Sequence, residues 1–209
     1  MVKLGQDKVI NGDFIILQQD VSEEEFYAFC DEDIKCELLD RVLVIQSPAN
    51  PEHEDIFGFL FTLLRLYLKN TGKGKVFGSR LAVHLSKEWN PEPDILVIAP
   101  SKYENLTEGR LEGPPDLVIE ILSKSTRDND EGKKLQAYLH FGVQEIWIVN
   151  PMEKTITIHT HEGTQTWDDS DQEEIVNSSV LEPFFIKIRW MWNREEFSEE
   201  DLIKEILSQ

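Results

Sequence analysis

The sequence predicts an α/β fold in which helices flank a mixed central β-sheet. Short continuous apolar runs, such as residues 117–119, are typical of strands that are buried on both faces. Residues 51–68 instead place apolar side chains at mostly helical spacing, and a second helical segment follows near residue 125. The resulting order, βαβββαβ, is that of one α/β domain within the 209 residues.

The N-terminal part is expected to hold a short helix, a hairpin and the longest helix. Ser22-Glu-Glu-Glu25 is a capping-box pattern, in which a serine and a glutamate satisfy free amides at a helix start. Two strand-like runs, 37–40 and 42–45, flank a tight connection and predict a hairpin. The helix over 51–68 is predicted to stop at Asn70-Thr-Gly72, because glycine suits the left-handed end of a helix.

The rest of the chain is expected to supply most of the sheet. A helix over residues 125–141 should begin at a Ser125 cap and end at Gly142. A last short helix should begin at Ser198-Glu-Glu-Asp201. Strands are predicted near residues 75–77, 80–84, 94–98, 117–119, 146–149, 155–158 and 184–190.

The composition indicates which cellular compartment and which binding partners to expect. With 21 basic and 40 acidic residues, the net charge of −19 opposes non-specific binding to phosphate backbones or anionic lipid. No apolar run is long enough for a signal peptide or a bilayer span, so we expect a cytoplasmic protein without membrane contacts. Cys30 and Cys36 are interpreted as two ordinary thiols in a reducing compartment.

No linker divides the chain into halves. We therefore expect an N-terminal extension over residues 1–21, a single domain over 22–190, and a C-terminal tail with a short helix over 191–209.

Two carboxylates lie at or inside the predicted buried strands. Asp94 ends Pro91-Glu-Pro-Asp94 at the start of one apolar run, and Glu120 lies inside Val-Ile-Glu-Ile-Leu. An acid at such a place is unfavourable unless it is paired or bound to a metal, so both are candidate ligands for a divalent cation. The simpler alternative for each is a solvated acid at a strand end.

Asp130, Lys134 and Tyr138 are spaced i, i+4, i+8 and share one face of the following predicted helix. If that face turns toward Glu120, the lysine can stabilise developing negative charge or hold an attacking water. The simpler alternative is an Asp–Lys pair with a tyrosine packed beside it on an exposed helix.

These residues resemble the Uma-two family of endonucleases, a branch of the PD-(D/E)xK nuclease superfamily. The resemblance covers roughly residues 22–190 and is most specific in the central third. It implies a restriction-endonuclease-like core, with an added N-terminal helix and β-hairpin, that hydrolyses nucleic-acid phosphodiester bonds, with DNA as the expected substrate. The matching segments are residues 37–40, Ser47-Pro48, Pro51-Glu-His53, Pro93-Asp94, Pro114 to Ser123, Ser125-Thr-Arg, Asp130, Lys134, Tyr138 and Gly142 to Trp147.

The resemblance also implies roles for individual residues. Asp94 and Glu120 would bind Mg²⁺ or Mn²⁺, and Lys134 would stand near the attacking water or the phosphate oxygens. For His53 a surface histidine at a helix start is the simpler alternative. The accessory candidates near the site are His53, Glu37, Lys124, Asp130 and Tyr138.

The sequence departs from the superfamily pattern at one important position. The lysine expected two residues after the second acid is replaced by Leu122, which cannot serve. In the Uma-two family the lysine has moved to the helix, where Lys134 matches, although Lys124 on the strand face is a rival. Arg41 stands where the hairpin of the family usually has glycine.

Three classes of function stay open at the level of sequence. A metal-dependent endonuclease would be favoured by basic residues around the acids. The second class is a catalytically silent binding or regulatory protein on the same fold. Such a protein could form a homodimer and could use the aromatic residues Trp89, Trp190 and Trp192 as contacts. A glycosidase using Asp94 and Glu120 would leave Lys134 without a role. The basic candidates are Lys73, Lys75, Arg80, Lys102, Arg110, Lys124 and Arg127.

Overall fold

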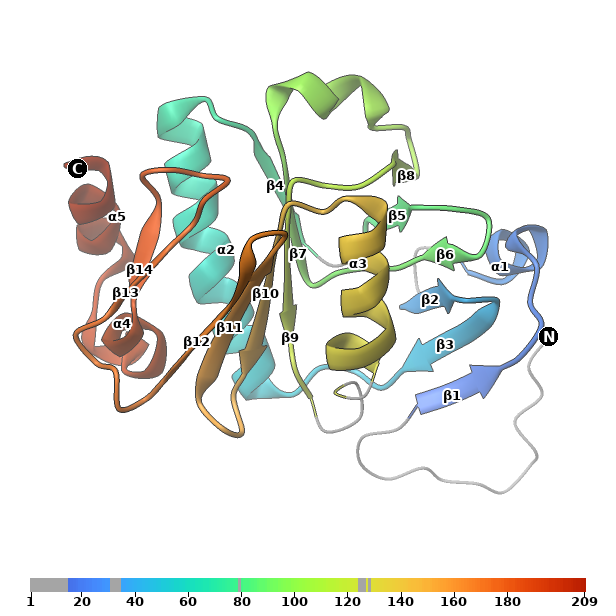
Figure 1. Cartoon of the computed structure of the whole chain (residues 1–209), viewed down its shortest axis with the longest axis horizontal. Coiled ribbons are helices and arrows are strands. Elements are labelled where there is room, and N and C mark those ends of the chain that lie inside the picture. The colour runs from blue at the N-terminus through green and yellow to red at the C-terminus, as the bar shows by residue number, and fades with distance from the viewer. Residues whose placement is uncertain (1–14, 31–34, 79, 124–126, 128) are drawn as a thin grey trace.

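A six-stranded mixed sheet forms the centre of the protein (Figure 1). The computed structural model describes residues 15–30, 35–78, 80–123, 127 and 129–209. Strands β9 and β10 are parallel, whereas every other neighbouring pair in this sheet is antiparallel, so the predicted mixed sheet is confirmed. In spatial order the strands are β12 (Gly163–Asp168), β11 (Thr155–Thr160), β10 (Glu145–Asn150), β9 (Leu117–Ile121), β7 (Ile95–Ile98) and β4 (Lys75–Gly78).

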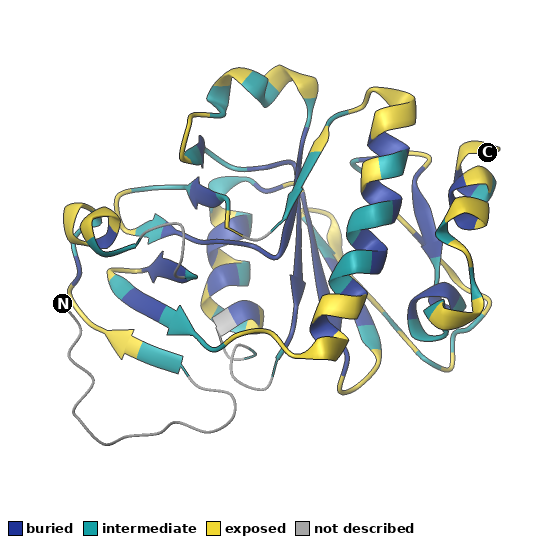
Figure 2. Ribbon diagram, turned by 180° about the vertical axis from the view of Figure 1, so that it is seen from behind, coloured by how far each residue is buried: buried dark blue, intermediate teal, exposed yellow. Residues whose placement is uncertain are grey.

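Helices cover both faces of this sheet. Helix α2 (Pro51–Thr71) packs its buried side against one face, and α3 (Leu135–Phe141) lies on the other (Figures 1 and 2). The side chain of Asn50 caps the first turn of α2, and Gly72 ends the helix with φ of 69°. The long predicted helix and its stop are therefore confirmed.

Strand β9 sends alternate side chains to the two faces, as the pleat requires. Leu117, Ile119 and Ile121 belong to the core under α2. Val118 and Leu122 belong instead to the core under α3. Glu120 shares the second face, so this alternation directs its carboxylate toward α3.

A smaller four-stranded sheet lies beside the central one. It contains, in spatial order, β1 (Ile15–Gln18), β3 (Val42–Gln46), β2 (Cys36–Leu39) and β6 (Trp89–Asn90). The predicted hairpin is confirmed as β2 and β3. Helix α1 (Glu23–Phe29) precedes it, and the predicted capping box forms in full between Ser22 and Glu25.

The turn between β2 and β3 has a backbone conformation that favours glycine at position 41. Asp40 and Arg41 have φ of 54° and 62°, as a two-residue type I′ turn requires. We expect Arg41→Gly to raise the melting temperature by about 2 °C, because removing about 1–2 kcal/mol of left-handed strain exceeds the entropy that glycine adds to the unfolded chain. Calorimetry would measure the change.

Arg41→Ala is the matched control, because alanine keeps the strained backbone and should give no increase. The backbone hydrogen bonds of Arg41, from its amide to Glu88 O and from Val21 N to its carbonyl, are available to either variant. A melting temperature that falls in the glycine variant would contradict the strain argument.

The second helix contains a turn that the sequence does not predict. Arg127 is helical, Asn129–Lys134 form a π-helical turn, and the helix continues as α3 to the left-handed Gly142. The predicted cap Ser125 and the rival lysine Lys124 lie outside the described residues.

The C-terminal strand prediction is partly wrong. Strand β14 (Phe185–Lys187) pairs with β13 (Ile175–Asn177), but the chain then forms α4 (Ile188–Trp192). Trp190 in α4 is 1% exposed, so it is not available as a contact residue. The last helix, α5 (Glu199–Leu207), is confirmed, although the Ser198 side chain makes no capping hydrogen bond.

The remaining elements complete the described fold. Strands β5 (Ala82–His84) and β8 (Arg110–Glu112) form a parallel pair, and a 3-10 helix spans Pro100–Asn105. Helix α5 packs against α2, and β1 pairs with β3, while the division into extension, domain and tail stays a prediction. Within the described ranges, no helix combines the length and the apolar character needed to cross a membrane.

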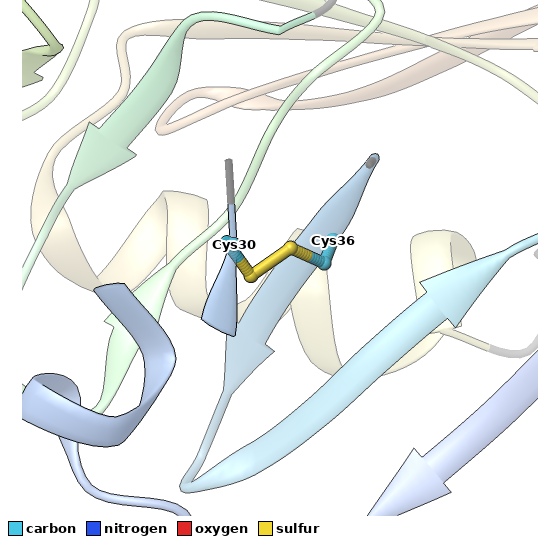
Figure 3. Close-up of a disulfide and its surroundings, with 2 residues drawn as sticks. All are labelled: Cys30 and Cys36. Carbon is cyan, nitrogen blue, oxygen red and sulfur yellow. A yellow bond between two sulfur atoms is a disulfide. The ribbon is translucent and has the colours of Figure 1, made fainter. Parts of the chain in front are cut away.

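The two cysteines are joined by a disulfide, so the prediction of two free thiols is wrong (Figure 3). Cys30 follows α1 and Cys36 begins β2, and their Cα atoms are 6.3 Å apart, within the usual range for a disulfide. The two cysteines come close because of how α1 packs on the hairpin, and their separation of six residues in the sequence does not reveal this packing.

Candidate active site

The two predicted ligands are neighbours across adjacent strands. Strands β7 and β9 are antiparallel with Ile95 opposite Ile119, so extending this register by one residue places Asp94 opposite Glu120. Directly opposite residues in such a pair have Cβ atoms about 4.5–5.5 Å apart. The amide of Ile121 also donates a hydrogen bond to Asp94 Oδ2 at 2.9 Å. The sheet therefore brings the two acids together, as the sequence predicted.

Asp94 is a buried carboxylate with a donor on each oxygen. Lys35 Nζ lies 2.9 Å from Oδ1, and His53 Nε2 lies 3.1 Å from Oδ2. Burial acts to raise the pKa of Asp94, but Lys35, His53 and the Ile121 amide together hold it well below its usual value. With 4% of Asp94 exposed, the alternative of a solvated strand-end acid is wrong.

His53 is brought to Asp94 by the first turn of α2. Asn50 accepts a hydrogen bond from the His53 amide, and the imidazole is buried against Asp94. Burial lowers the pKa of His53, but the hydrogen bond and charge of Asp94 outweigh it and raise the pKa above its usual value. The alternative of an exposed helix-start histidine is therefore wrong.

Lys134 lies at the centre of three carboxylates. Its Nζ is 2.8 Å from Glu37 Oε1, 2.8 Å from Glu120 Oε1 and 3.1 Å from Asp130 Oδ1. Burial lowers the pKa of Lys134, but these carboxylates raise it well above its usual value. An ammonium group has three donors, so these contacts can engage all of them.

The predicted helix face does turn toward the strand that carries Glu120. Tyr138 donates a hydrogen bond to Glu120 Oε1 at 2.7 Å, and Lys134 contacts the same oxygen. Burial raises the pKa of Glu120 to about 8, with Asp130 and Asp94 adding to the effect and Lys134 opposing it. The alternative of an exposed Asp–Lys helix pair is wrong, because this face is buried.

Glu37, predicted as an accessory residue, lies fully inside the cluster. Its Oε2 accepts a hydrogen bond from Gln46 Nε2 at 2.7 Å, and its Oε1 accepts one from the Glu92 amide at 2.9 Å. It therefore connects the hairpin to the segment that precedes Asp94.

Lys35 and Glu92 were missed by sequence reasoning. No described residue donates a hydrogen bond to the buried Glu92 Oε2, and burial followed by repulsion from Glu37 raises the pKa of Glu92 to about 7. One signal could have revealed Glu92, because it precedes Asp94 by two residues in a segment made extended by Pro91 and Pro93. No such signal exists for Lys35, which reaches Asp94 from the start of the hairpin.

The residues of the cluster suit a hard divalent cation. In the described ranges, no three or more His, Cys, Asp or Glu side chains are already arranged to hold a metal ion. However, negative charge exceeds the lysine charge, and carboxylate oxygens are the ligands that Mg²⁺ and Mn²⁺ prefer. The carboxylates are Glu37, Glu92, Asp94, Glu120 and Asp130, and the lysines are Lys35 and Lys134.

Several basic residues proposed for a nucleic-acid surface are paired with acids instead. Lys102 lies 2.8 Å from Asp116. Arg110 contacts Glu23 and Glu112, and Arg127 contacts Glu131 and Glu153. Arg80 is different in one respect, since its charge acts on Glu92 in the cluster and lowers the pKa of that acid.

A mixed sheet flanked by helices, with buried carboxylates on two adjacent strands and a lysine on the helical segment that faces them, places the protein among the nuclease-like α/β proteins. The chain belongs to the Uma2 family, described as "Putative restriction endonuclease", whose model matches residues 23–190. It is similar in structure to a "putative nuclease belonging to DUF820" from Anabaena variabilis, with a TM-score of 0.70 and 19% sequence identity. That likeness covers 83% of this chain and 98% of the other, and at this identity it shows the fold. No curated protein matches the chain.

Proposed function

We propose that this protein is a divalent-metal-dependent endonuclease that hydrolyses DNA phosphodiester bonds. The observation that carries the proposal is the buried pair Asp94 and Glu120, set opposite each other by the sheet within a surplus of carboxylates. Membership of a family described as "Putative restriction endonuclease" supports the same activity.

Asp94 and Glu120 would hold Mg²⁺ or Mn²⁺ in this proposal. The bound ion would supply Lewis-acid chemistry, which activates water and neutralises phosphate charge during phosphodiester hydrolysis. Asp94 is suited to the task because its neighbours keep it ionised. The hydroxyl of Tyr138 and the ammonium of Lys134 both hold Glu120 Oε1, which limits the orientations of this carboxylate.

Lys134 would act first as a positioning residue. Its three carboxylate contacts hold Glu37, Glu120 and Asp130 around one charge. To meet an attacking water or a phosphate oxygen, as the family pattern implies, the ammonium must exchange one of these contacts for the substrate. That role, and the rival role of Lys124, stay predictions.

One observation favours the alternative of a catalytically silent binding or regulatory protein. The pairs Lys102–Asp116, Arg110–Glu112 and Arg127–Glu131 neutralise basic residues that a nuclease would offer to DNA, in a chain of net charge −19. A silent protein would keep the buried cluster but show no cleavage, so one assay separates the two functions.

The deciding experiment incubates the purified protein with Mg²⁺, Mn²⁺ or EDTA on linear, supercoiled and single-stranded DNA and on RNA. We expect metal-dependent cleavage of DNA. Asp94→Asn and Glu120→Gln should each reduce the rate by about 1000-fold, because several kcal/mol of transition-state stabilisation depends on the metal.

Asp116→Asn is the matched control. Asp116 is also 4% exposed, precedes a strand of the same sheet and pairs with a lysine at 2.8 Å, but it lies outside the cluster. This variant should keep its activity, with circular dichroism confirming that every variant is folded. The nuclease proposal would be refuted if the protein cleaved no nucleic acid under any condition, or if Glu120→Gln kept full activity.

A further inference from the structure

Lys35 forms an ion pair with Asp94, one of the two acids that would bind the metal. Its Nζ lies 2.9 Å from Asp94 Oδ1, and its side chain is 26% exposed while that of Asp94 is 5% exposed. The ammonium therefore closes the cluster on a side that still reaches solvent. Lys134, by contrast, is sealed within its three carboxylates.

Both oxygens of Asp94 are engaged by donors of the chain itself. Lys35 binds Oδ1, while His53 and the Ile121 amide contact Oδ2. The Ile121 amide belongs to strand β9 and cannot leave without disrupting the sheet, and His53 is buried on α2. Lys35 is the partner of Asp94 that can be replaced by movement of a single side chain.

The backbone around Lys35 is held on its following side. Cys36 is fully buried and joined to Cys30, and Glu37 is fixed by Gln46 and Lys134. The lysine can thus turn toward solvent while its backbone and the hairpin stay in place.

We propose that Lys35 is a built-in cation that competes with the divalent metal for Asp94, so that metal binding must displace its ammonium group. This inference rests on the proposed function, because it takes Asp94 as a ligand of the metal. An ammonium beside a bound divalent ion is repelled by it, whereas in the metal-free protein the same ammonium compensates the Asp94 charge. In this proposal Lys35 weakens metal binding and stabilises the metal-free protein.

Mn²⁺ binding without nucleic acid tests the inference directly. Isothermal titration calorimetry and electron paramagnetic resonance would compare the wild type with Lys35→Met at one pH. We expect the variant to bind Mn²⁺ at least about tenfold more tightly, since an opposite charge at this range changes the affinity of a carboxylate for a proton by about one to three pKa units. Lys35→Arg keeps the charge and should stay near the wild-type affinity.

Lys102→Met provides the matched control, because Lys102 Nζ lies 2.8 Å from Asp116 and has a similarly exposed side chain. Its Mn²⁺ affinity should equal that of the wild type. If Lys35→Met is misfolded by circular dichroism, Lys35→Gln takes its place. If Lys35 had only a structural role, Lys35→Met and Lys35→Gln would bind Mn²⁺ more weakly than the wild type, which is the opposite of the expected result.

Asp94→Asn, alone and combined with Lys35→Met, separates failure of the inference from failure of the proposed function. If the wild type binds Mn²⁺ through Asp94 and Lys35→Met binds no more tightly, the competition is refuted and the metal site stands. If neither protein binds Mn²⁺ in a way that depends on Asp94, the metal site and the competition both fail. Tighter binding that disappears with Asp94→Asn supports both.

Discussion

Replacing Lys134 with methionine is expected to lower the free energy of unfolding by about 3–5 kcal/mol, as removal of one partner from a buried ion pair does. Methionine has a similar volume, so the effect would come from charge more than from packing. Without the ammonium, Glu37, Glu120 and Asp130 would face one another with nothing between them to compensate their charge.

Urea denaturation in EDTA would measure the loss. The control, Lys102→Met, removes an ion pair at the same distance but with a lysine that is 23% exposed, and it should lose about 1 kcal/mol or less. Adding Glu37→Gln to Lys134→Met should recover part of the stability by removing one of the repelling charges. A loss of less than about 1 kcal/mol in Lys134→Met would show that the lysine does not hold the cluster together.

The Lys134 result also decides how catalytic data should be interpreted. If Lys134→Met lowers both stability and cleavage, the loss of cleavage follows from misplaced carboxylates. A folded and stable variant without activity would instead place the ammonium at the reacting phosphate.

The metal-free protein is expected to become less stable as the pH rises from about 5.5 to about 8.5. The folded-state pKa values of Glu120 and Glu92, about 8 and about 7, lie above the ordinary value of 4.5. Between these limits the folded protein binds more protons than the unfolded chain, so stability is lost as the pH rises through the folded-state values. The raised pKa of His53 acts in the same direction.

Thermal unfolding in EDTA across this pH range would reveal the effect as a fall of about 5 °C or more in melting temperature. Glu120→Gln should flatten the profile, because glutamine keeps the shape of the side chain without titrating. Mg²⁺ should restore stability at the alkaline end if it binds these carboxylates. A profile that is flat or rises with pH would contradict the proposed charge surplus.

The sequence was informative where a single local pattern determines the structure. Helical spacing over residues 51–68 predicted α2, and the apolar run around Glu120 predicted β9. The spacing of Asp130, Lys134 and Tyr138 predicted the helix face that meets Glu120. Each of these features depends on residues that are close together within one helix or one strand.

The features that the sequence did not predict depend on contacts between segments that are distant in the chain. Lys35 reaches Asp94 because the hairpin lies against the segment that precedes β7, and Cys30 approaches Cys36 because α1 packs on that hairpin. The strand predicted over residues 184–190 changes to a helix at Ile188, where Trp190 turns into the core beside Phe185. A run of alternating apolar residues does not distinguish these outcomes.

The cross-strand placement of Asp94 and Glu120 has a consequence for recognising distant relatives of this protein. The separation of the two carboxylates in space is fixed by the sheet register, whereas residues 99–116, which include the 3-10 helix and β8, lie between the two strands in sequence. Insertions or deletions in that connection can change the sequence distance between the acids and leave their geometry intact. A search that demands a constant spacing would therefore miss proteins with the same site, whereas one that aligns the two strands separately would find them.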